Sequence, residues 1–247
     1  MVRLFTWAER PELADRGPAS ADVWPEYNRH GDVVEPLWGP LLDELREYQF
    51  ALVDEDDAVL AECHTGPLAW DGDDAHLPSG IDDTLRQIVN ARRDGSAVDT
   101  LSALAAEIGP GARGRGLAAE LLAGMRELAR RQGLQRLIAP VRPSWKERYP
   151  LAPIERYVTW RRPDGELLDP WLRLHVRLGA RISTPLPRSL LITGSVADWE
   201  QWTGLQFPDS GDYTFPHGLA TVEIDRDADT GTYWEPNVWL VHPELDA

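Results

Sequence analysis

The chain has one lysine, Lys146, and one cysteine, Cys63, among its 247 residues. A single cysteine excludes an internal disulfide and fits a reducing compartment. No window approaches the roughly 18 consecutive apolar residues of a membrane span. The first residues also lack the apolar stretch of a secretory signal. We therefore expect a cytoplasmic protein that has no membrane partner.

Positive charge is also scarce. The sequence holds 25 lysines and arginines against 41 aspartates and glutamates, which gives a formal net charge of −16. Nucleic acid selects basic surfaces, so this balance excludes it as the main partner. The acidic surface is compatible with a cationic acceptor such as an amine, and equally with a role in solubility alone.

The most informative stretch runs from residue 105 to residue 131. It begins within an apolar segment, Leu101–Ile108, which is typical of a buried strand. A Gly/Pro turn follows, and then Arg113-Gly114-Arg115-Gly116 leads into a helical repeat of leucines and alanines. The first amides of a helix lack intrahelical partners, and glycines let a ligand approach the backbone. The segment therefore predicts an anion site suited to phosphate.

The spacing of this turn excludes two common nucleotide motifs. Neither the triphosphate loop G-x-x-x-x-G-K-[ST] nor the dinucleotide fingerprint G-x-G-x-x-G is present. The pattern Arg113-x-x-Gly116-x-Ala118 instead resembles the Q/R-x-x-G-x-G/A motif of the GCN5-related N-acetyltransferase (GNAT) superfamily. The resemblance implies acetyl-CoA, or another acyl-CoA, as co-substrate. It also implies two sets of binding residues: Ala106, Glu107 and Ile108 for the pantetheine arm, and Arg113, Gly114, Arg115, Gly116, Leu117 and Ala118 for the pyrophosphate.

Hydrophobic periodicity predicts the order strand, helices, β-hairpin, helix, strand, helix, strand over the first 141 residues. This order favours a mixed sheet with helices on its faces, of the α/β (α+β) class. The resemblance implies the GNAT fold, in which a mostly antiparallel central sheet splays at the cofactor site. We expect one domain over residues 1–247, with its best-matching core at 100–182.

Two segments depart from the compact family pattern. Residues 143–170 are rich in aromatics, arginines and prolines, and form an insertion that is either an acceptor-side lid or a structural flap. Residues 188–247 form an extension that ends in a predicted hairpin. Trp24, Tyr27, Trp38 and Trp70 lie where the family builds its acceptor site, which suggests a bulky or aromatic acceptor.

Two residues are candidates for proton transfer. Glu107 interrupts an apolar strand beside the expected cofactor, so it is either a buried base with a raised pKa or an outward-facing strand residue. His175 lies in Leu174–Ala180, which resembles the family's L-Y-x-x-L-G-F helix end, at the position of the tyrosine that protonates the thiolate. It is either that acid or a core or surface histidine. Tyr149 and Tyr157 are weaker alternatives.

Other reactive residues fit no standard site. His64 and His76 flank an acidic segment, but their spacing matches no ligand set, so we expect no metal. Cys63 is expected to be a buried structural thiol, because its neighbour His64 points to the opposite face of a strand. A Ser-His-Asp triad is excluded by the lack of G-x-S-x-G.

The sequence thus indicates an acyl-CoA-dependent N-acyltransferase that moves acetyl to a primary amine of a small molecule by direct attack in a ternary complex. Three alternatives remain open. The chain is a non-catalytic acyl-CoA-binding sensor or scaffold, it transfers acyl groups to oxygen, or it decarboxylates an acyl-CoA. A homodimer is compatible with the sequence.

Overall fold

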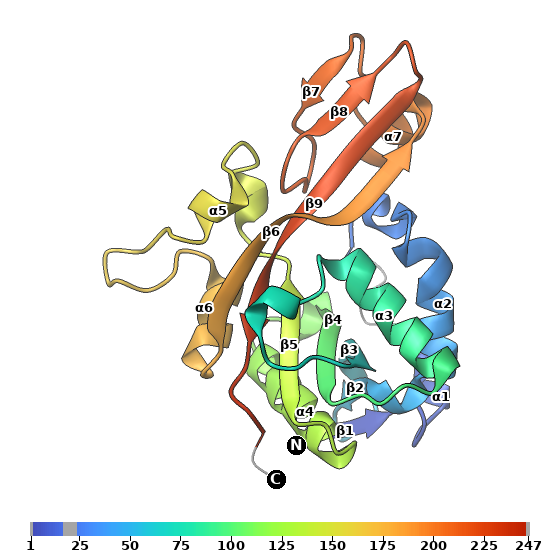
Figure 1. Cartoon of the computed structure of the whole chain (residues 1–247), viewed down its shortest axis with the longest axis vertical. Helices are drawn as coiled ribbons and strands as arrows, with labels where there is room; N and C mark the ends of the chain where they lie inside the picture. The colour runs from blue at the N-terminus through green and yellow to red at the C-terminus, as the bar shows by residue number, and fades with distance from the viewer. Residues whose placement is uncertain (1, 17–23, 246–247) are drawn as a thin grey trace.

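The computed structural model describes residues 2–16 and 24–245. A nine-stranded mixed sheet runs through the molecule, with helices on both of its faces (Figure 1). The strands are β1 (Arg3–Thr6), β2 (Gln49–Val53), β3 (Val59–Leu68), β4 (Thr100–Ile108), β5 (Arg136–Val141), β6 (Arg181–Gly194), β7 (Gly211–Tyr213), β8 (Val222–Asp225) and β9 (Thr230–Val241). The α-helices are α1 (Glu12–Asp15), α2 (Val34–Glu44), α3 (Ile81–Asp94), α4 (Leu117–Arg131), α5 (Ile154–Tyr157), α6 (Pro170–Arg177) and α7 (Val196–Thr203).

The sheet has the order β1-β2-β3-β4-β5-β9-β8-β7, and β6 also pairs with β9. The pairs in this order are antiparallel except for β4 with β5, which is parallel. That parallel pair covers only Thr100–Ser102 of β4. The two strands then diverge, which confirms the expected splay and leaves the rest of β4 without a partner on the β5 side.

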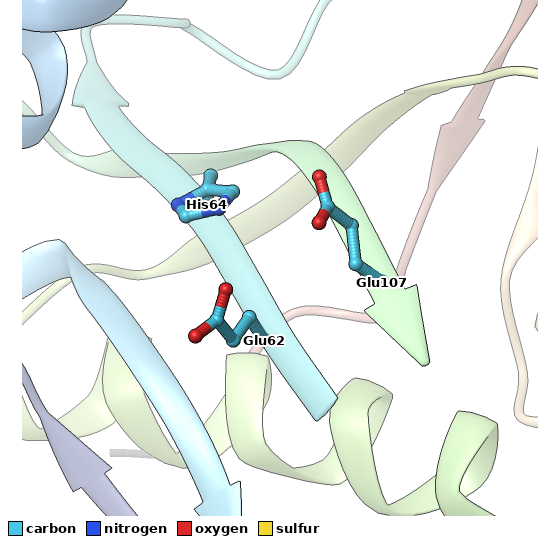
Figure 2. A group of neighbouring side chains, drawn as sticks. All are labelled: Glu62, His64 and Glu107. Atoms are coloured by element: carbon cyan, nitrogen blue, oxygen red, sulfur yellow. The ribbon is translucent and has the colours of Figure 1, made fainter. Parts of the chain in front are cut away.

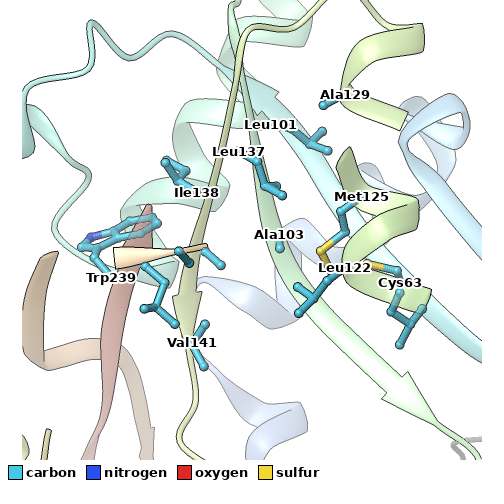
Figure 3. Packing of buried hydrophobic residues seen from close by; sticks show 14 of the residues in the cluster. Cys63, Leu101, Ala103, Leu122, Met125, Ala129, Leu137, Ile138, Val141 and Trp239 are labelled. Carbon is cyan, nitrogen blue, oxygen red and sulfur yellow. The ribbon is translucent and has the colours of Figure 1, made fainter. Parts of the chain in front are cut away.

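Alternation along β3 sets what each face of the sheet carries. Cys63 points to the face covered by α4, where it packs near Leu122 and Met125 (Figure 3). Its burial confirms the expected structural thiol. Gly66 points to the opposite face, where a Cβ would lie 2.5 Å from Ile88 of α3. The absence of a side chain there lets α3 pack directly on the strand.

The C-terminal extension prolongs the sheet (Figure 1). β6 is one long strand that leads into it, and the predicted hairpin is β8–β9. The segment before this hairpin contains the short strand β7. A second apolar cluster around Trp199 fills this end, where the indole Nε1 donates to the carbonyl of Gly231.

Hydrophobic spacing suggests helical pieces at 22–27 and 33–48. In the second segment α2 ends at Glu44, and Arg46–Tyr48 continues as a 3₁₀ turn. Residues 26–30 form a 3₁₀ helix, η1 (Glu26–His30), and residues 22–23 lie outside the described residues. Within the described ranges, no helix is both long and apolar enough to cross a bilayer.

Candidate active site

A cavity of about 1380 Å³ occupies the gap where β4 and β5 diverge. Residues from both faces of the sheet line it. Leu121 and Met125 come from α4 on one face, and Val34 and Trp38 come from α2 on the other. Because the strands are separated here, the cavity passes through the sheet. Two substrates can therefore enter from opposite faces and meet at the splay.

The predicted phosphate turn lies at the α4 side of this cavity. Gly114 and Gly116 have φ values of 79° and 81°, in the left-handed region that favours glycine. Gly116 is the N-cap of α4 and makes no side-chain cap hydrogen bond. In the described part of the chain, the backbone amides of residues 113–118 donate to no protein acceptor. A row of open donors at a helix start is the geometry that holds phosphate.

The side chains of this turn add charge to the same place. Within the described ranges, Arg113 and Arg115 make no ion pair. Arg113, Gly114 and Ala118 line the cavity, whereas Arg115, Gly116 and Leu117 belong to the same turn without lining it. The guanidinium groups are thus available to an anion that enters along α4.

The open edge of β4 continues from this turn. Ala106, Glu107 and Ile108, the predicted pantetheine contacts, all line the cavity. The strand also carries a β-bulge, because His64 pairs with Ala105 whereas Thr65 pairs with Ala103, leaving Leu104 as the extra residue. The bulge lies where the register with β3 changes, four residues before the end of β4 at Ile108.

Three buried titratable side chains meet on the face of β3 and β4 that carries Gly66. Glu62 and His64 come from β3, and Glu107 comes from β4 directly opposite Glu62 (Figure 2). Their nearest ligand-type atoms all lie within 4.8 Å of one another. All three line the cavity. The structure thereby excludes the alternative that Glu107 is an exposed strand residue, since it is 6% exposed.

The surroundings of Glu62 disfavour the ionised form of its carboxyl group. Burial, and secondly the nearby Glu107 carboxylate, raise the pKa of Glu62 from 4.5 to about 7. It is 3% exposed and has no hydrogen-bond or ion-pair partner within the described residues. A buried carboxylate without a partner is costly, so a cationic ligand in the cavity would be stabilised there.

The tautomer of His64 follows from its neighbour Gln49. The Gln49 Nε2 donates at 2.9 Å to the carbonyls of both Leu45 and Thr65, so its Oε1 must act as an acceptor. His64 Nδ1 lies 3.3 Å from this Oε1 and therefore carries the proton. Burial lowers the pKa of His64, which keeps the ring neutral and leaves Nε2 as its acceptor nitrogen.

Tryptophans wall this part of the cavity. The Trp24 Nε1 donates to Glu107 Oε1, and the rings of Trp7 and Trp38 pack edge-on against His64 at centroid distances of 5.3 and 5.4 Å. Of the aromatics expected at the acceptor site, Trp24 and Trp38 line the cavity, whereas Tyr27 and Trp70 do not. The Trp7 Nε1 is buried without a partner, which leaves a donor open beside the cluster.

His175, the predicted acid, lies on α6 and also lines the cavity. Its side chain is buried, and its Nδ1 lies 3.0 Å from Nε2 of His242. Burial lowers the pKa of both imidazoles, so the pair is neutral near pH 7. The His175 Nε2 has no partner within the described chain. The surface alternative for this histidine is therefore excluded, and one ring nitrogen remains open.

Most of the 143–170 insertion packs as a flap. The buried Asp169 accepts hydrogen bonds from the Trp145 amide and the Tyr157 hydroxyl, and it caps α6. Burial and, secondly, the neighbouring Asp169 carboxylate raise the pKa of Tyr157, whose hydroxyl donates to Asp169. Trp145 at the start of the insertion and Pro170 at its end line the cavity, so the two ends of the segment contribute to the wall.

Sequence reasoning missed Glu62 and His64 as members of the site. A charged residue inside the apolar run Val59–Cys63 is the same signal that identified Glu107. The signal was available, but only the β3–β4 register, formed between residues about 45 apart in the chain, brings the two carboxylates together.

No family model matches the chain. An arginine N-acetyltransferase from Aspergillus versicolor is 31% identical over 97% of this chain and 93% of its own length. The loading GNATL domain of CurA from Lyngbya majuscula superposes with a TM-score of 0.61 at 17% identity, covering 98% of this chain and 97% of that one.

A second solved structure has a similar fold. The GphF GNAT-like decarboxylase, in complex with isobutyryl-CoA, gives a TM-score of 0.57 at 19% identity, with both chains fully covered. At this level of identity the two structures show a shared fold.

Proposed function

Because the chain belongs to the GCN5-related N-acetyltransferase superfamily and catalyses acyl-CoA-dependent N-acetyl transfer to an amine, we propose that its donor is acetyl-CoA and its acceptor a small cationic compound of the arginine class. The observation that supports this acceptor is the buried, unpartnered Glu62 beside Glu107 in the cavity. The similarity to an arginine N-acetyltransferase points to the same chemistry.

The donor would bind along α4. The open amides of residues 113–118, with Arg113 and Arg115, suit its pyrophosphate, and the free edge of β4 suits the amides of its pantetheine arm. The thioester supplies an activated acetyl group. Bound this way, its carbonyl would reach the splay, where the bulge at Leu104 interrupts the regular strand.

The acceptor would bind on the other face, with its cationic end among Glu62, Glu107 and His64. Glu62 is the best candidate for the base, because a pKa of about 7 matches proton uptake at neutral pH. Glu107 then holds the cation, since one of its oxygens already accepts from Trp24. Glu62 first takes a proton from the acceptor nitrogen, which frees its lone pair to attack the carbonyl carbon. The N–C bond forms as the C–S bond breaks, and the second proton of the nitrogen leaves to solvent.

His175 would stabilise the departing thiolate by a hydrogen bond. Its lowered pKa leaves no imidazolium near pH 7 to serve as the expected acid. Of the two tautomers of the histidine pair, the favourable one has His242 Nε2–H donating to His175 Nδ1, which places the proton of His175 on Nε2, the open nitrogen. His242 Nδ1 is then a lone pair, in keeping with a pKa of His242 that burial and, secondly, the Arg126 charge lower. The thiolate accepts from His175 Nε2–H, and solvent supplies the proton that completes the free thiol.

The test of the proposed function is an acceptor panel with purified protein and acetyl-CoA. We expect release of free thiol with L-arginine or a related guanidino compound, and a product that is heavier by one acetyl group. The linkage should resist hydroxylamine, as an amide does and an ester does not. Binding of CoA without thiol release for any cationic acceptor would instead indicate a non-catalytic module, and a hydroxylamine-labile product would indicate transfer to oxygen.

His175→Phe should lower kcat with acetyl-CoA about 100-fold, because a hydrogen bond to charge that develops in the transition state contributes on this scale. An aryl thioester of acetate, whose thiolate is stable without that hydrogen bond, should remove most of the difference between variant and wild type. His76→Phe is the control, since His76 is exposed and lies outside the cavity. An equal loss with both donors would show that His175 supports packing and does not contact the thiolate.

A further inference from the structure

Arg142 is another charged residue of the cavity wall, immediately after the last residue of β5. Two of its nitrogens are held by the protein. The Nε donates to Oε2 of Glu235 at 3.1 Å, and Nη2 donates to the Tyr27 hydroxyl at 3.1 Å and to the carbonyl of His217 at 2.8 Å. The acceptors lie on β9, on η1 and in the loop between β7 and β8, so three separate segments fix the plane of the guanidinium.

The third nitrogen of this guanidinium is open. In the described part of the chain, Nη1 of Arg142 donates to no protein acceptor. This nitrogen is not fully buried. Arg142 lines the cavity and its side chain is 18% exposed, which makes Nη1 a candidate contact for a ligand in the cavity. Arginine stays charged in proteins, so Nη1 is a fixed, charge-assisted donor.

We propose that Arg142 Nη1 binds the carboxylate of the acceptor and makes the enzyme selective for amino-acid acceptors over simple amines. This inference rests on the proposed function, because it assumes an acceptor in the same cavity. The charges support the assignment. Glu62 and Glu107 repel a carboxylate, whereas Arg142 attracts one, so the cavity offers different side chains to the guanidinium and to the carboxylate of an arginine-class amino acid.

A neighbouring residue adds a second polar contact. Asn28 follows Tyr27 on η1 and lines the same cavity, and its Oδ1 is buried without a partner. Since Tyr27 binds the Arg142 guanidinium, the Asn28 carbonyl oxygen lies on the element that braces Arg142. It offers an acceptor for an N–H group of the bound amino acid.

The first test compares acceptors with the wild-type enzyme. L-Arginine, its methyl ester and agmatine, the decarboxylated analogue, share the guanidinium but differ in the carboxylate. We expect kcat/KM for L-arginine to exceed that for the other two by about tenfold or more, which is the scale of one hydrogen bond to a charged group. The difference should arise mainly in KM.

The second test replaces the Arg142 guanidinium, the proposed hydrogen-bond donor to the carboxylate. In Arg142→Lys the ammonium keeps the ion pair with the buried Glu235, but it lacks a separate Nη1 for the ligand. The preference for L-arginine over agmatine should fall to about twofold or less, with kcat for agmatine within about threefold of wild type. Arg93→Gln, on the exposed face of α3, is the matched control and should keep the full preference.

The outcomes separate the two proposals. If no cationic acceptor is acetylated, the proposed function fails. If acetylation occurs and wild type uses agmatine or the methyl ester as well as L-arginine, the carboxylate site is overturned while the proposed function stands. An Arg142→Lys variant that keeps the full preference would also overturn it. Should that variant not fold, the wild-type comparison alone decides.

Discussion

Replacing Glu62 by glutamine should lower kcat/KM for the acceptor by about 100- to 1000-fold, because the amide cannot take up the acceptor's proton. The wild-type rate should rise with pH through about 7, where Glu62 becomes ionised, and the residual rate of Glu62→Gln should lack this step. Glu107→Gln should raise KM for the acceptor more than it lowers kcat. Glu44→Gln, at an exposed position of α2, should leave both constants unchanged.

The Glu62→Gln substitution should stabilise the folded protein at alkaline pH. The folded-state pKa of Glu62 is raised from 4.5 to about 7, so folding is penalised as pH rises through this window, and the penalty is complete above it. At pH 8 Glu62→Gln should therefore gain up to about 3 kcal/mol in free energy of unfolding, given 1.36 kcal/mol per pKa unit. At pH 4 the two proteins should be equally stable, as measured by urea denaturation.

Three results would contradict the assignment of Glu62 as the base. Activity within about threefold of wild type in Glu62→Gln would exclude Glu62 as the base. A stability loss at pH 8 would show that Glu62 has a partner in the free protein. Finally, one histidine and two carboxylates also suit a divalent metal. If a chelator abolished activity and a metal ion restored it, the cluster would be a metal site.

Gly116→Glu should abolish the rise in melting temperature that CoA produces. At a CoA concentration of 100 times Kd, binding stabilises the wild type by about 2.7 kcal/mol, or about 5–10 °C for a chain of this size. A glutamate at the N-cap of α4 places a negative charge among the open amides of residues 113–118, where the pyrophosphate would lie. The measurement is a thermal melt with and without CoA.

Gly133→Glu is a closely matched control. Gly133 has a φ of 70°, near the 81° of Gly116, and a Cβ at either position would meet no atom within 4 Å. Both variants therefore carry the same backbone strain, but Gly133 follows the C-terminal end of α4, far from the phosphate turn. We expect Gly133→Glu to keep the full CoA response. Equal responses from the two variants, in either direction, would contradict a phosphate site at the N-terminus of α4.

The segment that we assign to the cofactor can be predicted from the sequence alone. The strand, the turn and the helix of residues 101–131 are contiguous, and their apolar periodicity, glycines and arginines are local signals. The structure places Gly114 and Gly116 in the left-handed conformation that such a turn requires, and it leaves their amides open. His175 was also identified from a local pattern, as a residue near the end of a helix.

Only the tertiary structure decided the acceptor side. Glu62 reaches Glu107 through the register of β3 on β4, His175 meets His242 across the fold, and Arg142 is fixed by β9 and η1. The two members of each pair are far apart in the chain, so the sequence around one of them does not indicate the other. Strand register and helix packing are set by burial of the whole core, so a cavity assembled from both faces of the sheet arises only when the chain folds.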